Sequence, residues 1–347
     1  MDVRLTDEQR ALRDSAAHVV NSLAPRTVRE LDDLERAAKL DAAVEASGWR
    51  ELRTAGDDGM PLASAVEAAL IAEELGRGPA DASFLGPTLA AELRRLAAAP
   101  PASSPETVAF LPDLSAPATT AADGTSPSLA IAIDARWASS ALVLVAAPGG
   151  YLLGEVTADD AVPTVDITRP VALVDPAAAV PVPQQERTIT AEDLTRWASL
   201  GLAMTCADLV GAMRGAVQLA CEYAMTRRQF GATIGSFQAI QHRLADAFAS
   251  MEGSRSIALH AAWAVDASSA DDSMAAAAGA KAYCARAGRA VCEAAIQVHG
   301  GIGNTWECMA HLYLRRSLLS GDILGGVGAS LARVLGHRGI GSGHGLC

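Results

Sequence analysis

Three long stretches with helical periodicity follow one another after residue 189, and they constrain the fold more than any other feature of the sequence. They cover residues 190–228, 236–268 and 271–301. Each is too long for an isolated core helix, and small residues recur in each at helical spacing, which permits close packing of one helix on another. We therefore expect a bundle of long helices over residues 189–347.

The chain before this bundle divides into two regions of different character. Residues 5–96 are rich in Ala, Leu, Glu and Arg, with apolar residues three and four positions apart, which is typical of short amphipathic helices. Short aliphatic runs between residues 128 and 175 have the length of strands and leave no room for helices between them. The Pro-, Ser- and Thr-rich segment 97–128 marks a boundary.

The sequence therefore predicts a mainly α fold with a small central β-domain. We expect an N-terminal helical domain over residues 1–97, a reduced β-domain over 98–188 and a long-helix bundle over 189–347. A doubly wound sheet is excluded because its strands need helices between them.

Charge and hydropathy narrow the class of partner. The formal net charge is −12, and no basic stripe is visible, so we expect no nucleic-acid partner. The N-terminus carries charges where a signal peptide has an apolar stretch. The sequence contains no run of about 18 uninterrupted apolar residues, the length that a membrane-spanning helix needs. We expect a cytoplasmic protein that does not bind a membrane.

The cysteines and histidines show no metal-ligand spacing. No C-x-x-C or H-E-x-x-H pattern occurs, so we expect no metal site. We interpret the cysteines as small buried hydrophobic residues. They are Cys206, Cys221, Cys284, Cys292, Cys308 and Cys347.

A first motif runs from Tyr223 to Asp246 and includes the sequence RRQFG. Arg227, at the end of a helix, offers a forked and permanently charged donor that suits a pyrophosphate. Phe230 offers a flat face for a ring system, and Gly231 lets the chain turn. The alternative is an exposed arginine followed by an ordinary helix-terminating Phe-Gly pair.

A second motif, QVHGGIG, begins at Gln297. Gly300 and Gly301 follow a long helix and allow backbone amides to approach a phosphate or an adenine edge, while Gln297 reaches the ligand from the last helical turn. By itself, such a motif is more often a helix stop than a nucleotide site.

The two motifs, their separation and the order of the three regions resemble the acyl-CoA dehydrogenase family. The resemblance covers most of the chain and is strongest over residues 221–316. It implies the acyl-CoA dehydrogenase fold, with a C-terminal four-helix bundle, and FAD bound at a subunit interface, where the two motifs of one chain hold the pyrophosphate and adenosine of its neighbour's cofactor. The cofactor contacts implied for this chain are Arg227, Phe230, Gln238, Gln297, Gly300 and Gly301.

The sequence departs from the family pattern at two places. The T-E-P-x-x-G-S-D-like segment that covers the flavin ring has no counterpart in residues 105–128, and the β-domain is short. The family's catalytic glutamate, which removes a proton from the thioester, aligns with Leu324, and its alternative location aligns with Gly201. Neither residue can accept a proton. Asp322 is a displaced carboxylate that could substitute.

Three interpretations follow from this resemblance. The first is a reduced, base-deficient subunit of an FAD-dependent oxidoreductase that acts on the CH–CH bond of an acyl-CoA, paired with a full-length chain in an α2β2 heterotetramer. Some actinobacterial members of the family have this arrangement and act on steroid side-chain thioesters. Electron-transfer flavoprotein would be the electron acceptor. The second is a self-sufficient homo-oligomeric dehydrogenase that uses Asp322, and the third is a non-enzymatic structural paralogue.

Overall fold

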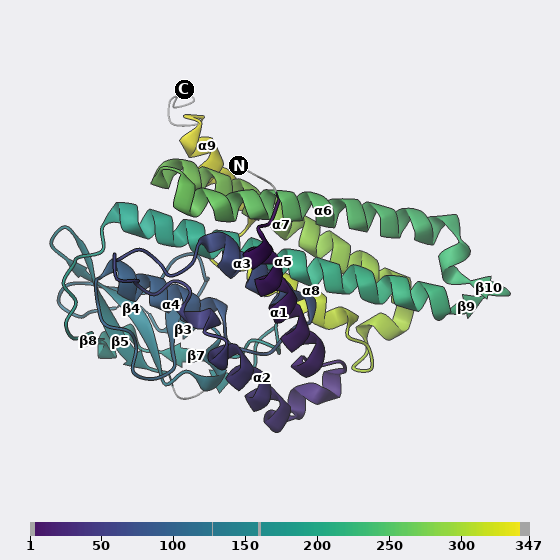
Figure 1. Ribbon diagram of the computed structural model, residues 1–347, viewed down its shortest axis with the longest axis horizontal. Coiled ribbons are helices and arrows are strands. Elements are labelled where there is room, and N and C mark those ends of the chain that lie inside the picture. The colour runs from purple at the N-terminus through teal and green to yellow at the C-terminus, as the bar shows by residue number, and fades with distance from the viewer. Residues whose placement is uncertain (1–3, 127, 159–160, 341–347) are drawn as a thin grey trace.

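The computed structural model describes residues 4–126, 128–158 and 161–340, and Cys347 therefore lies outside the described residues. The N-terminal region is helical, as expected from its periodicity (Figure 1). A capping box begins the first helix, because Thr6 Oγ1 accepts from the backbone N–H of Gln9 at 3.1 Å. The helices are α1 (Asp7–Leu23), α2 (Leu34–Ala46), α3 (Ala65–Arg77) and α4 (Leu85–Leu96), with short 3₁₀ turns η1 (Val28–Asp32) and η2 (Trp49–Glu51).

A small mixed sheet follows, with the strand order β6-β7-β3-β1-β4-β5-β8. Strand β1 pairs in parallel with β4 and antiparallel with β3, so it lies inside the sheet. The strands are β1 (Glu106–Phe110), β2 (Thr119–Thr120), β3 (Ala130–Ala132), β4 (Ser140–Ala147), β5 (Gly150–Thr157), β6 (Ala161–Val162), β7 (Val171–Val174) and β8 (Val180–Pro181), with 3₁₀ turns η3 (Ala135–Trp137) and η4 (Pro176–Ala178).

The position of β1 corrects one expectation. The segment 97–128 was expected to be a boundary that opens the β-domain, with the first strand at residue 128, yet it contains the innermost strand, in which all five residues are buried. A strand that is covered on both faces has no polar and apolar alternation, so its sequence carries no period of two.

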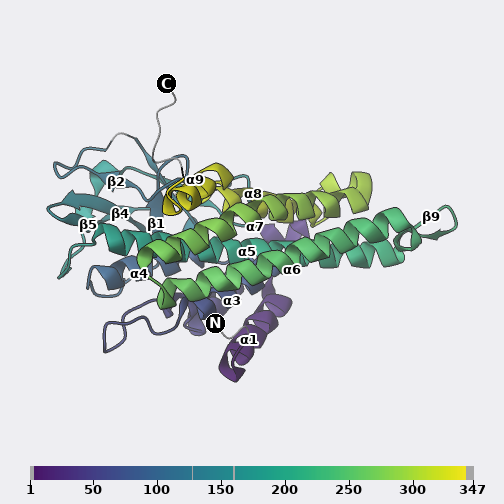
Figure 2. The same ribbon diagram turned by 90° about the horizontal axis from the view of Figure 1, so that it is seen from above.

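Helices form the rest of the chain. They confirm the predicted fold class, a mainly α protein with a small β-domain in the middle of its sequence. In Figures 1 and 2 they run side by side along the long axis, with the sheet at one end. A small hairpin of β9 (Arg228–Gln229) and β10 (Ala232–Thr233) closes the opposite end. The helices are α5 (Ala191–Thr226), α6 (Gln238–Ala267), α7 (Ala270–His299), α8 (Ala310–Asp322) and α9 (Val327–His337), with 3₁₀ turns η5 (Ile234–Ser236) and η6 (Gly300–Asn304).

The central helix of the bundle is α5. It packs on α3, α6, α7 and α8, and nearly all of its residues from Trp197 to Val217 are buried. By length and composition, two described stretches could cross a membrane, residues 191–226 and 310–337. The first is this buried core helix. The second is interrupted between α8 and α9, where Leu324 and Gly325 both have positive φ.

A buried network of charges ties the β-domain to the helical bundle. Arg169 of the β-domain donates to Asp134 at 2.8 Å and to Ser320 of α8 at 2.9 Å, and Ser320 donates to Asp208 of α5 at 2.6 Å. Arg316 of α8 lies 2.7 Å from Asp208. Burial opposes the ionisation of Asp134, but the charge of Arg169 outweighs it and lowers the pKa of this carboxyl.

Candidate functional site

The first motif lies at the tip of the bundle, where α5 ends. Arg227 caps this helix, and its backbone N–H donates to the carbonyl of Tyr223 at 2.8 Å. The side chain of Arg227 is exposed and forms no ion pair with any described residue. Phe230 is 96% exposed and has a φ of +51°, and Gly231 completes the turn with a φ of +79°. The ring of Phe230 meets the ring of Phe237 edge-on, with the centroids 6.4 Å apart, so both rings lie at the exposed turn after α5.

The second motif lies where α7 ends. Gly300 has a φ of +67°, which favours glycine, and a Cβ added to Gly300 or Gly301 would meet nothing within 4 Å. The backbone is therefore open on its outer side, as a close approach by a phosphate or an adenine requires. Gln297 lies on the last turn of α7 with its side chain exposed.

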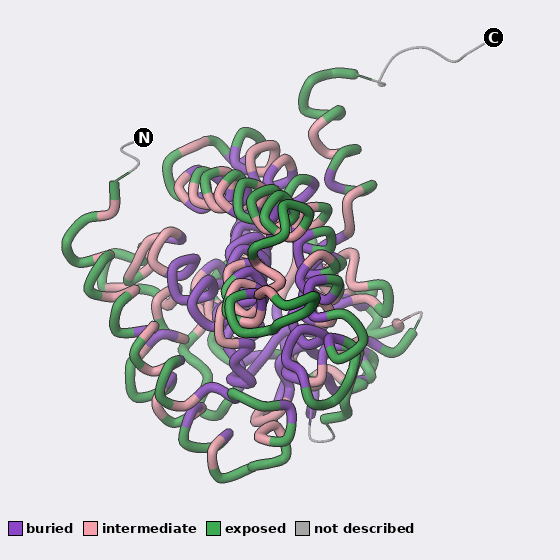
Figure 3. The backbone as a smooth tube through the Cα atoms, turned by 90° about the vertical axis from the view of Figure 1, so that its right-hand side faces the viewer, coloured by how far each residue is buried: buried purple, intermediate pink, exposed green. Residues whose placement is uncertain are grey.

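The two motifs meet at the same end of the bundle, although about 70 residues separate them in the sequence. The ring of Tyr223 from α5 stacks on the ring of His299 from α7, with the centroids 4.5 Å apart. An apolar cluster lies beneath both motifs and includes Val298 and, at its edge, Ile234. Viewed from this end, the exposed backbone of the tip projects in front of the buried helices (Figure 3).

The remaining residue of the predicted contact set lies at the same end of the bundle. Gln238, the first residue of α6, is also exposed and lies just beyond the hairpin. The predicted contacts thus combine an exposed guanidinium, amide side chains, open glycine backbone and an uncovered ring at this end of the bundle. If a neighbouring subunit provides the pocket that encloses the ligand, this chain does not need a pocket of its own here.

The position of the expected catalytic glutamate has a different character. Leu324 is 1% exposed, and its backbone N–H donates to the carbonyl of Leu114 at 2.7 Å. Leu114 belongs to the loop after β1, in the region where the flavin-covering segment was expected. Both leucines have positive φ, +63° and +58°, a conformation that costs a non-glycine residue about 1 kcal/mol or more.

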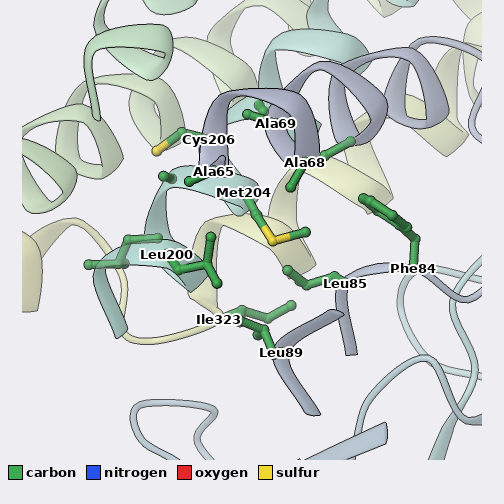
Figure 4. Close-up of a cluster of buried hydrophobic side chains, with 14 of the residues drawn as sticks. Ala65, Ala68, Ala69, Phe84, Leu85, Leu89, Leu200, Met204, Cys206 and Ile323 are labelled. Carbon is green, nitrogen blue, oxygen red and sulfur yellow. The ribbon is translucent and has the colours of Figure 1, made fainter. Parts of the chain in front are cut away.

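Gly201, the alternative location for a base, is adjacent to Leu324. A Cβ added to Gly201 would be 2.4 Å from Leu324 Cδ1 and 3.5 Å from both methyl carbons of Leu89. Figure 4 shows the surrounding cluster, in which Leu89, Leu200 and Ile323 lie close together. Leu89, Leu200 and Ile323 are each 0% exposed, so no space as large as a water molecule adjoins them.

Asp322, the displaced carboxylate, does not share this dry environment. It ends α8 and is exposed, and its Oδ1 lies beside Gly326, 3.3 Å from where a Cβ of that residue would be. A base that removes a weakly acidic C–H proton needs a position that excludes water. The observed position of Asp322 does not provide one.

Sequence reasoning missed one residue of this region, Lys281 of α7. Its ammonium group is fully buried and donates to Thr205 Oγ1 at 2.9 Å, to the Ile323 carbonyl at 3.0 Å and to the Ser320 carbonyl. Burial lowers the pKa of Lys281 to about 8. The lysine therefore fastens the end of α8, and with it Leu324, to the centre of the bundle. An isolated lysine within an apolar helical stretch was the only available signal.

The described residues contain no group of three or more His, Cys, Asp or Glu side chains that could hold a metal ion. The described cysteines are free, and the burial of Cys292 raises its thiol pKa to about 12, so it behaves as a packed hydrophobic residue.

The sequence comparisons identify the family. Residues 199–340 match the model of the acyl-CoA dehydrogenase C-terminal domain. The acyl-CoA dehydrogenase IpdE2 of Mycobacterium tuberculosis is 31% identical over 331 residues, which cover 92% of this chain and 93% of that protein. The chain belongs to the acyl-CoA dehydrogenase family. This membership confirms the resemblance, and with it the expected cofactor, FAD.

Solved structures confirm the acyl-CoA dehydrogenase fold. The ChsE4-ChsE5 complex from Mycobacterium tuberculosis contains a chain that superposes with a TM-score of 0.79 at 24% identity, over 98% of this chain and 99% of that one. The Tcur3481-Tcur3483 steroid acyl-CoA dehydrogenase, as a G363A variant, gives 0.78 at 22% identity, over 96% and 98%. This chain is therefore similar in fold, over nearly its whole length, to a chain of the ChsE4-ChsE5 complex and to a chain of a steroid acyl-CoA dehydrogenase.

Proposed function

We propose that this chain is the reduced subunit of a heteromeric acyl-CoA dehydrogenase. It completes the FAD site of a full-length partner chain and supplies no catalytic base of its own. The observation that carries this proposal is the closed apolar site at Leu324, where both expected base positions adjoin and neither carries a proton acceptor.

The closed site argues against independent catalysis. Dehydrogenation of an acyl-CoA needs room for the acyl group between a carboxylate and the flavin, which accepts a hydride when it is bound. Here, the loop after β1 is hydrogen-bonded directly to the backbone of Leu324, and the surrounding side chains leave no space for a ligand. The hydrogen bond between Leu114 and Leu324 lies in the region where the family's flavin-covering segment was expected.

The exposed end of the bundle supports a role in a partner's cofactor site. Arg227 would hold the pyrophosphate, Phe230 would cover a ring face, and Gln238 and Gln297 would hydrogen-bond the nucleotide. The open backbone at Gly300 and Gly301 would admit its close approach. These groups would act in trans, because all of them are exposed around the ends of α5 and α7 and the start of α6.

The comparisons support a substrate class and a two-component assembly for the complex. One similar fold belongs to a steroid acyl-CoA dehydrogenase, and both reported structures are two-component complexes. We therefore infer that the complex acts on an acyl-CoA thioester derived from a steroid and forms an α2β2 heterotetramer. By family, electron-transfer flavoprotein would accept the electrons. The exposed position of Asp322 disfavours the self-sufficient alternative.

The test is to produce this chain together with a full-length acyl-CoA dehydrogenase chain from the same genome and to measure the flavin content of the complex. Arg227→Ala and Gln297→Ala should lower FAD per complex at least tenfold at a fixed low FAD concentration, because each removes a direct contact. Arg289→Ala is the matched control, since Arg289 is also exposed but pairs with Glu293. Unchanged flavin in both contact variants would contradict the proposal and favour the structural paralogue.

A further inference from the structure

An exposed tryptophan lies three residues beyond the second motif, QVHGGIG. Trp306 is 61% exposed, and Ile302 of the same loop is 41% exposed. Val165, from the β-domain, is 56% exposed and lies beside them, because its carbonyl accepts from Arg315 at 3.1 Å. We call Val165, Ile302, Trp306 and Arg315 the Trp306 patch. It crosses the junction between the β-domain and the end of the bundle.

The tryptophan is held in place although it is exposed. The guanidinium of Arg315 lies 5.6 Å from the centre of the Trp306 ring, and the ring of His311 meets it edge-on at 5.1 Å. His311 is 8% exposed, and its burial lowers the pKa of the ring, which favours the neutral form. Arg315 forms no ion pair with a described residue. The ring is therefore oriented before any partner arrives.

We propose that the Trp306 patch is the anchor by which this chain docks on the flavin-carrying subunit. Tryptophan and arginine are the residues most enriched at the energetic centres of protein interfaces, and a rigid ring loses little entropy on binding. The unpaired charge of Arg315 suits a carboxylate at the rim of the partner. The inference rests on the proposed function and names the surface that function requires.

The position of the Trp306 patch indicates which molecule covers it. The Trp306 patch continues directly from Gly300 and Gly301, where the partner's FAD would lie. A second copy of this chain would bring its own closed site to that place, because Leu324 and Leu114 occupy the region in which its flavin ring would sit. The partner that covers the Trp306 patch is therefore a chain with an open flavin site.

The test compares Trp306→Ala with Met60→Ala in the complex described above. Met60 is 60% exposed and lies in the N-terminal region, so it matches Trp306 in exposure but not in place. Trp306→Ala should weaken assembly at least tenfold in analytical ultracentrifugation, and Met60→Ala should leave it unchanged. Circular dichroism of each isolated chain would exclude misfolding as the cause.

The possible outcomes separate this inference from the proposed function. A wild-type complex whose assembly is insensitive to Trp306→Ala, with FAD still lost in Arg227→Ala, would overturn the inference alone. Failure of the wild-type chains to form any flavin-containing complex would overturn the proposed function and the inference with it. Equal weakening of self-association and of the complex by Trp306→Ala would show that a second copy covers the Trp306 patch, which also contradicts the inference.

Discussion

Replacing Leu324 with glutamate restores the residue type that the family uses as its base, and it should fail to restore catalysis. Leu324 is 1% exposed, so its removal forfeits roughly 2–3 kcal/mol of burial. A carboxyl group without a hydrogen-bond partner costs about 1–3 kcal/mol more at such a position, even when neutral. The expected destabilisation is thus about 4 kcal/mol, measured by urea unfolding of the isolated chain.

The destabilisation of Leu324→Glu should grow with pH. Burial raises the pKa of a carboxyl group, so the folded state holds its proton to a higher pH than the unfolded state does. Stability present at low pH is therefore lost as the pH rises through the folded-state pKa. Leu62→Glu, at a leucine that is 61% exposed, should change stability by about 0.5 kcal/mol or less. A stable Leu324→Glu variant that binds FAD and oxidises an acyl-CoA would refute the closed site.

Other predictions concern single residues of the bundle. Because the pKa of Lys281 is lowered to about 8 from 10.5, the unfolded chain binds the proton between these values, so stability should rise by roughly 3 kcal/mol across this interval. Lys281→Met should abolish this rise in the free energy of unfolding, measured by denaturant unfolding at a series of pH values. The same pH dependence in Lys281→Met and in the wild-type chain would show that the Lys281 ammonium is not its source. Gly211→Ala should destabilise the chain by about 3 kcal/mol, because the added Cβ would lie 2.0 Å from the Glu73 carbonyl oxygen, whereas Gly279→Ala, with its nearest neighbour at 4.0 Å, should stabilise it by about 1 kcal/mol. Thermal unfolding distinguishes the two, and equal effects would contradict the close packing of α3 on α5.

The long helices were predictable because their signal is local and repeated. The expected stretch 190–228 became Ala191–Thr226, with Thr190 and Asp193 forming a capping box. Strand β4 occupies residues 140–147, the aliphatic run that was expected to be a strand. Strand β1 was not predicted, because it is buried on both faces and prolines and serines flank it in the sequence.

The candidate site was predictable in its residues but not in its geometry. The motif residues were identified from their chemistry, and the structure gathers them at one exposed end of the bundle; their contacts with FAD stay a prediction. The closure at Leu324 depends on a hydrogen bond to Leu114, which is 210 residues away in the sequence. No local pattern reports such a contact. The role of Lys281 was missed for the same reason, since its acceptors lie on α5 and beyond α8.

The central claim is that this chain holds a partner's FAD and none of its own. Its most direct test is the flavin stoichiometry of the purified isolated chain and of its complex with a full-length dehydrogenase chain, measured by flavin absorbance after denaturation. We expect no stoichiometric FAD on the isolated chain and a single FAD for each pair of chains in the complex. Stoichiometric FAD on the isolated chain, bleached by an acyl-CoA, would contradict it.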